Sequence, residues 1–180
     1  MTTDETANWV TFEKHGPITV ITLNRPEKLN AFHISMDETI TSYLQSLNEG
    51  EYETRCLILT GEGRAFCSGA DVGNLAQRSS LNEERKPPWR PAHSEARLPR
   101  TLRDCDVPII GALNGYAIGM GLGLALATDL RIAADDARFQ VAQIKRGLFA
   151  DYGLGHLLPQ QVGHQRGLEL MLTARMFDAQ

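Results

Sequence analysis

The chain has 180 residues, 42% of them hydrophobic, and a formal net charge of -4 at pH 7, a composition typical of one globular domain, which we expect to span residues 1–180. Its 22 acidic and 18 basic residues are well mixed, which argues against a nucleic acid or an anionic membrane as a partner. The three cysteines lack the spacing of a zinc site or a CxxC pair, so we expect reduced thiols and no metal site. The N-terminus lacks the order of a signal peptide, so we expect a cytoplasmic location.

The first part of the chain alternates between strand and helix patterns. Residues 9–14 and 18–23 are rich in β-branched and aromatic side chains and flank a His-Gly-Pro segment, so they predict a hairpin. Residues 56–60 form an apolar run bounded by charge and by glycine, which predicts a strand covered on both faces. With a helix between them, these strands indicate an α/β fold.

That helix is predicted to start at Ser35. The apolar residues that follow recur with helical spacing, and Ser35 and Glu38 have the spacing of a capping box. Gly50 is expected to end the helix.

Residues 77–100 are rich in charged and polar side chains and in proline, which is poor material for a packed core. We expect a mobile surface loop here, either a solvated spacer or a lid near a site. Further strands are predicted at 107–113, 130–134 and 137–140, and short helices at 153–163 and 164–173.

The segment from Gly111 to Asp129 places a glycine at every fourth position up to Gly123. Such spacing can form the packing face of a membrane helix, but the interrupting proline, asparagine and glycines argue against a long helix. A dinucleotide-binding loop needs a third glycine where Leu124 stands. The pattern favours a strand, a glycine turn, and a helix that begins near Met120.

The first N–H groups of such a helix have no partner within it and can stabilise negative charge, including charge that develops on a carbonyl oxygen. A second glycine turn, FCSGADV, follows the strand at 56–60 and offers another backbone N–H. Two such donors could form an oxyanion hole, although glycine turns often only connect the elements of an α/β fold.

Four blocks along the chain resemble the enoyl-CoA hydratase/isomerase family, also called the crotonase family. They are NRPEKLNAF, GEGRAFCSGADV, NGYAIGMGLGLALATDLRIA, and ARFQ followed by LLPQQVGHQRGLELMLT. The resemblance implies an α/β fold of stacked ββα units, an acyl-CoA thioester as substrate, and two backbone donors that hold the thioester oxygen as an enolate forms. By matching blocks, these donors belong to Ala70 and Met120.

The same resemblance implies which residues border coenzyme A, which enters as part of the substrate; no metal or redox cofactor is implied. These residues are Lys28, Leu29, Ala31, Ser68, Asp71 and Val72.

The chain departs from the family pattern at the positions that carry the two glutamates of the hydratases. Gly123 and Gln143 stand there, and neither can serve as a general acid or base at neutral pH. Members similar to this chain more often have glycine where Met120 stands, but a backbone N–H donor does not depend on the side chain.

Asp151 matches a loop position from which some isomerase, dehalogenase and hydrolase branches of the family present an aspartate to the substrate. Its other interpretation is a cap of the following helix. His156 and His164 are interpreted as packing or surface residues, and Cys67 as a neutral buried thiol. Asp129 and Arg131 are interpreted as a structural ion pair and not as site residues.

We therefore expect an acyl-CoA enzyme with isomerase-type proton transfer and Asp151 as base. An enoyl-CoA hydratase and a non-catalytic acyl-CoA-binding scaffold remain as alternatives.

The family usually continues with C-terminal helices that build a trimer or hexamer, and Asp178 is predicted to cap a helix that stops at once. We thus expect a truncated C-terminal part, weakened assembly, and exposed apolar surface near Leu168, Leu172 and Phe177.

Overall fold

The computed structural model describes residues 8–48, 53–71 and 97–180, and its largest element is a five-stranded sheet. The strands lie in the order β1-β2-β3-β5-β7, and only β1 and β2 are antiparallel. Their bounds are Val10–His15 for β1, Ile18–Leu23 for β2, Cys56–Gly61 for β3, Ile109–Leu113 for β5 and Leu130–Ala133 for β7. The predicted hairpin is confirmed by the β1–β2 pair.

A smaller four-stranded sheet continues from the end of the first. It contains β4 (Ala65–Cys67), β6 (Tyr116–Ile118), β8 (Arg138–Gln140) and β9 (Phe177–Asp178), in that order. Successive strands of the chain divide between the two sheets, as in β3 with β4, β5 with β6 and β7 with β8. The expected α/β fold of ββα units is confirmed, most clearly in β5, β6 and the helix after them.

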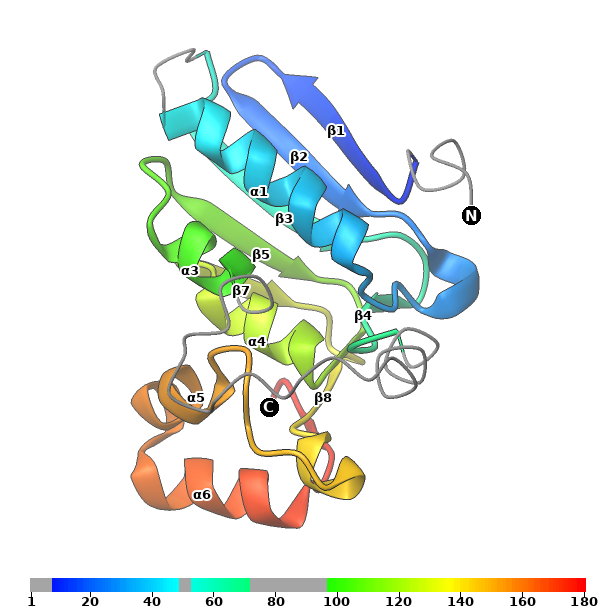
Figure 1. Ribbon diagram of the computed structural model, residues 1–180, viewed down its shortest axis with the longest axis vertical. Helices are drawn as coiled ribbons and strands as arrows, with labels where there is room; N and C mark the ends of the chain where they lie inside the picture. The colour runs from blue at the N-terminus through cyan, green and yellow to red at the C-terminus, as the bar shows by residue number, and fades with distance from the viewer. Residues whose placement is uncertain (1–7, 49–52, 72–96) are drawn as a thin grey trace, which may run out of the picture.

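Helices form a layer beside the five-stranded sheet, with α1, α3 and α4 over one of its faces (Figure 1). Each helix packs beside the next along the chain. They are α1 (Ile34–Asn48), α3 (Arg97–Arg103), α4 (Met120–Ala127), α5 (Leu154–Val162) and α6 (His164–Thr173). The core lies where one face of β2, β3 and β5 meets α1 and α4.

The two faces of β3 differ in burial. Leu57 and Leu59 are fully buried, whereas Cys56, Ile58 and Thr60 are only half-buried. The predicted strand is confirmed, but the expectation that both faces are covered is wrong.

The start of α1 differs from the predicted capping box. Ser35 lies inside the helix, and its backbone N–H donates to Nδ1 of His33 at 3.1 Å. His33 therefore supplies the acceptor that Ser35 was predicted to supply, because the helix begins two residues earlier than the capping box implied. Gly50 lies outside the described residues.

The segment predicted as a loop from 77 to 100 ends in a helix. Residues 97–100 belong to α3, and Leu98 is fully buried against the core. The loop prediction is wrong for these residues, because the buried Leu98 anchors a short basic helix that composition alone did not reveal. The rest of the segment lies outside the described residues.

The glycine-rich segment from Gly111 divides among β5, β6 and the eight-residue helix α4, which begins at Met120 as predicted. Within the described ranges, no helix is long and apolar enough to cross a membrane.

Asp178 was expected to cap a helix, but this is wrong. It lies in β9, where it pairs with Arg138, and the ring of Phe177 lies 5.5 Å from that of Phe139. Strand pairing and the aromatic contact together place this segment on the edge of the smaller sheet. Leu168 and Leu172 are exposed as expected, while Phe177 is half-buried.

A buried hydrogen bond joins α1 to the turn before α5. The hydroxyl of Tyr152 donates to Oδ2 of Asp37 at 2.9 Å, and Tyr152 is 4% exposed. Burial raises the pKa of Tyr152 well above its usual value, and the adjacent Asp37 raises it further. The turn that carries Asp151 is thus fixed to the first helix of the chain.

We expect Tyr152→Phe to lower the free energy of unfolding near neutral pH by about 1–3 kcal/mol, since it removes a hydrogen bond to a buried carboxyl group. The difference should shrink above pH ~10, because the tyrosine ionises there in the unfolded chain but stays neutral in the folded one. Wild type should then lose up to about 1.4 kcal/mol more per pH unit than the variant. Denaturant unfolding between pH 7 and 11 measures both curves, and parallel curves would contradict this account.

Candidate functional site

The first part of the candidate site is the turn after β2. A 3₁₀ helix, η1 (Pro26–Lys28), is followed by Leu29 and Asn30, both left-handed with φ of 51° and 53°. Asn30 is fully buried and donates to the carbonyl oxygens of Glu62 and Ala65 at 2.9 and 2.7 Å. An asparagine tolerates this conformation and its amide fixes the turn to the chain around β4.

This turn lies against Ser68. The Ser68 N–H donates to the Leu29 carbonyl oxygen at 3.0 Å, and its hydroxyl donates to that of Lys28 at 3.4 Å. Three of the residues predicted to border coenzyme A are therefore brought together by direct contacts.

Arg25 contacts two more of the residues predicted to border coenzyme A. Its guanidinium donates to the carbonyl oxygen of Ala31 at 2.7 Å and forms an ion pair with Asp71 at 3.1 Å. The side chain is only 5% exposed and lies 3.8 Å from the ring centre of Trp9. A charge held this closely by several partners makes the arrangement rigid. Val72, the last predicted binding residue, lies outside the described residues.

The backbone around Ala70 leaves its N–H directed away from the neighbouring segment. Phe32 donates to the carbonyl oxygen of Gly69 at 2.7 Å, and Asp71 donates to that of Phe32 at 3.0 Å. In such a parallel bridge the N–H of the middle residue points to the other side. No hydrogen-bond partner for the Ala70 N–H is found among the described residues.

Met120 is the first residue of α4, so its N–H has no partner inside the helix. The preceding Gly119 has φ 54°, and Gly69 has φ 103°. A Cβ at Gly69 would lie 3.0 Å from the carbonyl oxygen of Ile118 and 3.9 Å from the nitrogen of Met120. The two turns with the predicted oxyanion donors are thus in contact.

Asp151 is linked to the same helix start through Gln143. Nε2 of Gln143 donates to Oδ1 of Asp151 at 3.0 Å. The Gln143 amide in turn lies beside Gly119, where a Cβ would be 3.8 Å from Nε2. The structure thus connects Asp151 to the residue before Met120 through one buried side chain.

The alternative interpretation of Asp151 as a helix cap is wrong. The N-cap of α5 is Gly153, and no side chain forms a capping hydrogen bond there. Only the backbone carbonyl of Asp151 takes part, accepting from Leu154 at 3.0 Å. Its carboxylate faces Gln143 instead, because the left-handed Tyr152 and Gly153 turn the chain between Asp151 and the helix.

Gly123 allows this arrangement. A Cβ here would lie less than 3.0 Å from the carbonyl oxygen of Tyr152, closer than real Cβ atoms come to other atoms. The backbone next to Asp151 therefore occupies the space that a side chain at 123 would need. This supplies a physical reason for the missing glutamate at this position.

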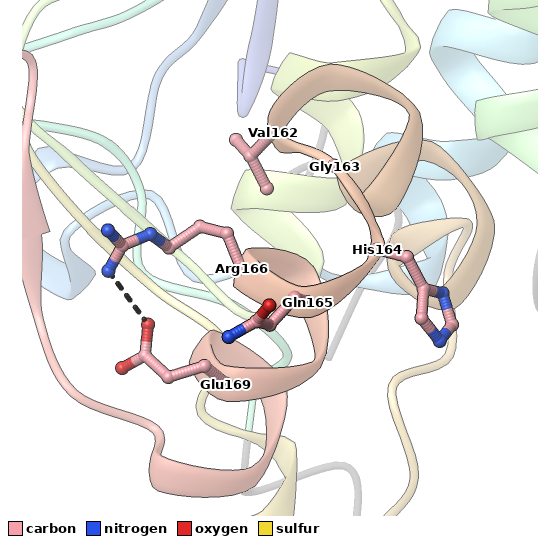
Figure 2. Close-up of a pocket in the computed structure, with 6 residues that line it drawn as sticks. All are labelled: Val162, Gly163, His164, Gln165, Arg166 and Glu169. Atoms are coloured by element: carbon pink, nitrogen blue, oxygen red, sulfur yellow. Dashed lines mark hydrogen bonds and ion pairs between the residues drawn. The ribbon is translucent and has the colours of Figure 1, made fainter.

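The other candidate residues do not join the site. Cys67 is fully buried, and burial raises the pKa of its thiol to about 12, so it is neutral as expected. His156 contacts Gln160 on the exposed face of α5. His164 is one of the residues around a pocket where α5 meets α6, and Figure 2 shows its ring directed away from the Arg166–Glu169 ion pair.

The ion pair expected between Asp129 and Arg131 is not formed. Asp129 accepts from the N–H of Ile109 at 2.9 Å, whereas Arg131 donates to the carbonyl oxygen of Thr128 and to Gln161. Both side chains bind groups around β7 instead, because each is held by other hydrogen-bond partners.

Three residues important to this geometry were given no role from the sequence. Arg25 and Asn30 both belong to the NRPEKLNAF block, which was quoted as a whole. Polar residues within a predicted turn are the signal by which the sequence could have identified them. Tyr152 gave no signal, since its partner Asp37 is distant in the sequence.

Residues 13–180 match the sequence profile of the enoyl-CoA hydratase/isomerase family. A probable enoyl-CoA hydratase from Rhodobacter capsulatus is 37% identical over 176 residues, which cover 95% of this chain and 63% of that protein. The 1,2-epoxyphenylacetyl-CoA isomerase of Escherichia coli is 37% identical over 171 residues, or 91% of this chain and 62% of that protein.

A solved enoyl-CoA hydratase from Bacillus anthracis has a TM-score of 0.81 and 32% identity, covering 95% of this chain and 65% of that one. The chain therefore spans less than two thirds of the length of these relatives.

We expect Gly123→Ala to lower the free energy of unfolding by about 2 kcal/mol or more. The added methyl group meets a backbone oxygen, and this strain exceeds the ~1 kcal/mol that alanine gains over glycine in a helix. Gly167→Ala in α6 is the matched comparison, because a Cβ there would lie 3.0 Å from Pro159, so the cost should be smaller. A Gly123→Ala protein at least as stable as wild type in thermal unfolding would contradict the close approach.

Proposed function

Since the chain belongs to the enoyl-CoA hydratase/isomerase family, we propose that it stabilises an enolate formed from an acyl-CoA thioester and moves a proton on the acyl group, as an isomerase does. The observation that carries this proposal is the contact of Asp151 with Gln143 beside the start of α4. It supports a carboxylate near one of the two proposed oxyanion donors, because the Gln143 amide that binds Asp151 also lies beside Gly119, the residue before Met120.

The N–H groups of Ala70 and Met120 are proposed to hold the thioester oxygen. A thioester α-proton is weakly acidic, so its removal requires stabilisation of the negative charge that develops on this oxygen. Preorganised N–H donors can each contribute about 3 kcal/mol to that stabilisation. The support is that the two turns touch at Gly69 and that neither N–H has a partner among the described residues.

Asp151 is proposed as the base. Its carboxylate takes the α-proton, the electron pair of the broken C–H bond passes to the enolate, and the proton returns at a different carbon. No electrons leave the substrate, so this step needs no redox cofactor. Asp151 is half-buried and free of any capping role, which leaves its second oxygen available for the proton.

The coenzyme A part of the substrate is proposed to lie along Lys28, Leu29, Ala31, Ser68, Asp71 and Val72. Contacts between the turn after β2 and Ser68, and the ion pair of Arg25 with Asp71, support a rigid edge here.

The three cysteines are free thiols, in keeping with the cytoplasmic location expected from the sequence.

Two other functions are alternatives to the isomerase. A hydratase with the usual pair of glutamates is disfavoured, because Gly123 has no room for a side chain and Gln143 cannot transfer a proton. A non-catalytic acyl-CoA-binding scaffold would retain the fold and bind the thioester without turnover. The E. coli relative is an isomerase by name, which supports the isomerase type among these.

We expect the wild-type protein to exchange the α-protons of an acyl-CoA thioester with deuterium from the solvent, and Asp151→Asn to slow this by about 10²-fold or more. A panel of aliphatic, unsaturated and arylacetyl-CoA thioesters, followed by NMR, supplies the probes. Asp135→Asn, an exposed aspartate in the turn before β8, is the matched control. Tight thioester binding with exchange at the uncatalysed rate would reject the enzyme and leave the scaffold.

Met120→Pro should reduce the exchange rate by about 10²- to 10³-fold, because it deletes one N–H donor at a helix position that accepts proline. Met120→Ala keeps that donor and should lose much less. Acyl-CoA affinity, measured by calorimetry on both variants, shows whether the turn is preserved. Equal losses in the two variants would contradict a role for the Met120 N–H.

A further inference from the structure

Gln143 holds a buried amide in an unusual environment. The residue opens the 3₁₀ helix η2 (Gln143–Arg146) and is 6% exposed. Its Nε2 donates to Oδ1 of Asp151, while its Oε1 is buried and has no hydrogen-bond partner within the described part of the chain. One end of the amide thus binds Asp151, and the other has no partner among the residues described.

The unpartnered oxygen argues that this amide is not present for stability. A buried polar atom without a partner costs about 1–3 kcal/mol, and an apolar side chain of the same shape would avoid that cost. The interaction that the amide does form is directed at the one carboxylate proposed to react. Unsatisfied buried groups in folded proteins call for a specific explanation, and a role at the site is one.

The surroundings fix where the amide points. The Gln143 carbonyl oxygen accepts from the N–H of Leu148 at 3.1 Å, so the backbone at the start of η2 is held. The amide group also lies against Gly119, within 4 Å of the place a Cβ would take. A planar group held against the turn before Met120 defines the position of Asp151 relative to that turn.

From this we infer that Gln143 is a positioning residue for the base. Its Nε2 holds Oδ1 of Asp151, so that Oδ2 is the oxygen left to take the substrate proton. This inference rests on the proposed function, because it assigns Gln143 a task in the reaction that Asp151 performs. Gln143 itself touches neither the proton nor the thioester.

Gln143→Met tests the inference, because methionine has nearly the same shape and lacks the N–H donor. We expect kcat for α-proton exchange to fall about 10- to 100-fold, as for a misplaced reacting group, with KM changed by less than about twofold. Unfolding stability should stay the same or rise, since the unpartnered oxygen is removed. Gln161→Met on α5, which also removes one hydrogen bond, is the matched control.

A double-mutant cycle separates positioning from a structural role. If Gln143 acts through Asp151, adding Gln143→Met to Asp151→Asn should lower the exchange rate no further. Gln143→Leu repeats the measurement if the methionine variant does not fold. Exchange unchanged in both Gln143 variants, or additive losses in the cycle, would overturn the inference and leave Asp151 as base.

An activity-independent measurement tests the contact itself. The side-chain amide protons of Gln143, identified by their loss in Gln143→Met, should exchange with solvent measurably faster in Asp151→Ala than in wild type. Unchanged amide exchange would overturn the inference whatever the kinetics. Absence of α-proton exchange in wild type, by contrast, would reject the proposed function and the inference together.

Discussion

The geometry of this protein depends on the close approach of α4 to the turn at Tyr152. Residue 123 has no side chain, so the carbonyl oxygen of Tyr152 can lie against the helix backbone. From the opposite side, the Tyr152 hydroxyl donates to buried Asp37 on α1. The turn is held between two helices, and this places Asp151, one residue earlier, beside the Gln143 amide.

This constraint links two features that look independent. A glutamate at 123 would need the space that the backbone of Tyr152 now fills, so a carboxylate on α4 and the present turn exclude each other. At the other hydratase position, an amide replaces the acid and donates to Asp151. In the proposed site the two differences therefore belong to one arrangement, in which Asp151 supplies the carboxylate from the loop before α5.

A second rigid unit fixes the turn with Ala70. Arg25 is buried and bound to Asp71 and Ala31, and Asn30 bridges to the chain around β4. A buried ion pair adds little net stability by itself because desolvation opposes it, but it holds one geometry strongly. That suits a site in which backbone N–H groups must be in place before charge develops.

The sequence by itself determined the features that depend on local pattern. The hairpin of β1 and β2, the α/β order and the start of α4 at Met120 follow from residue spacing and glycine positions, and the quoted blocks are sufficient to identify the family. The local pattern also indicated the two glycine turns, but Ala70 and Met120 were assigned as oxyanion donors by the resemblance to the family, and this assignment stays a prediction.

Only the tertiary structure decided what surrounds Asp151. The spacing of Asp151 from α5 suits a cap, and the contact that draws its carboxylate to Gln143 joins two loops across the start of α4. Likewise β9 replaces a helix because Phe177 meets Phe139, and α3 ends a polar segment because Leu98 reaches the core. Local preferences are worth about 1 kcal/mol or less per residue, and burial of one large side chain exceeds that.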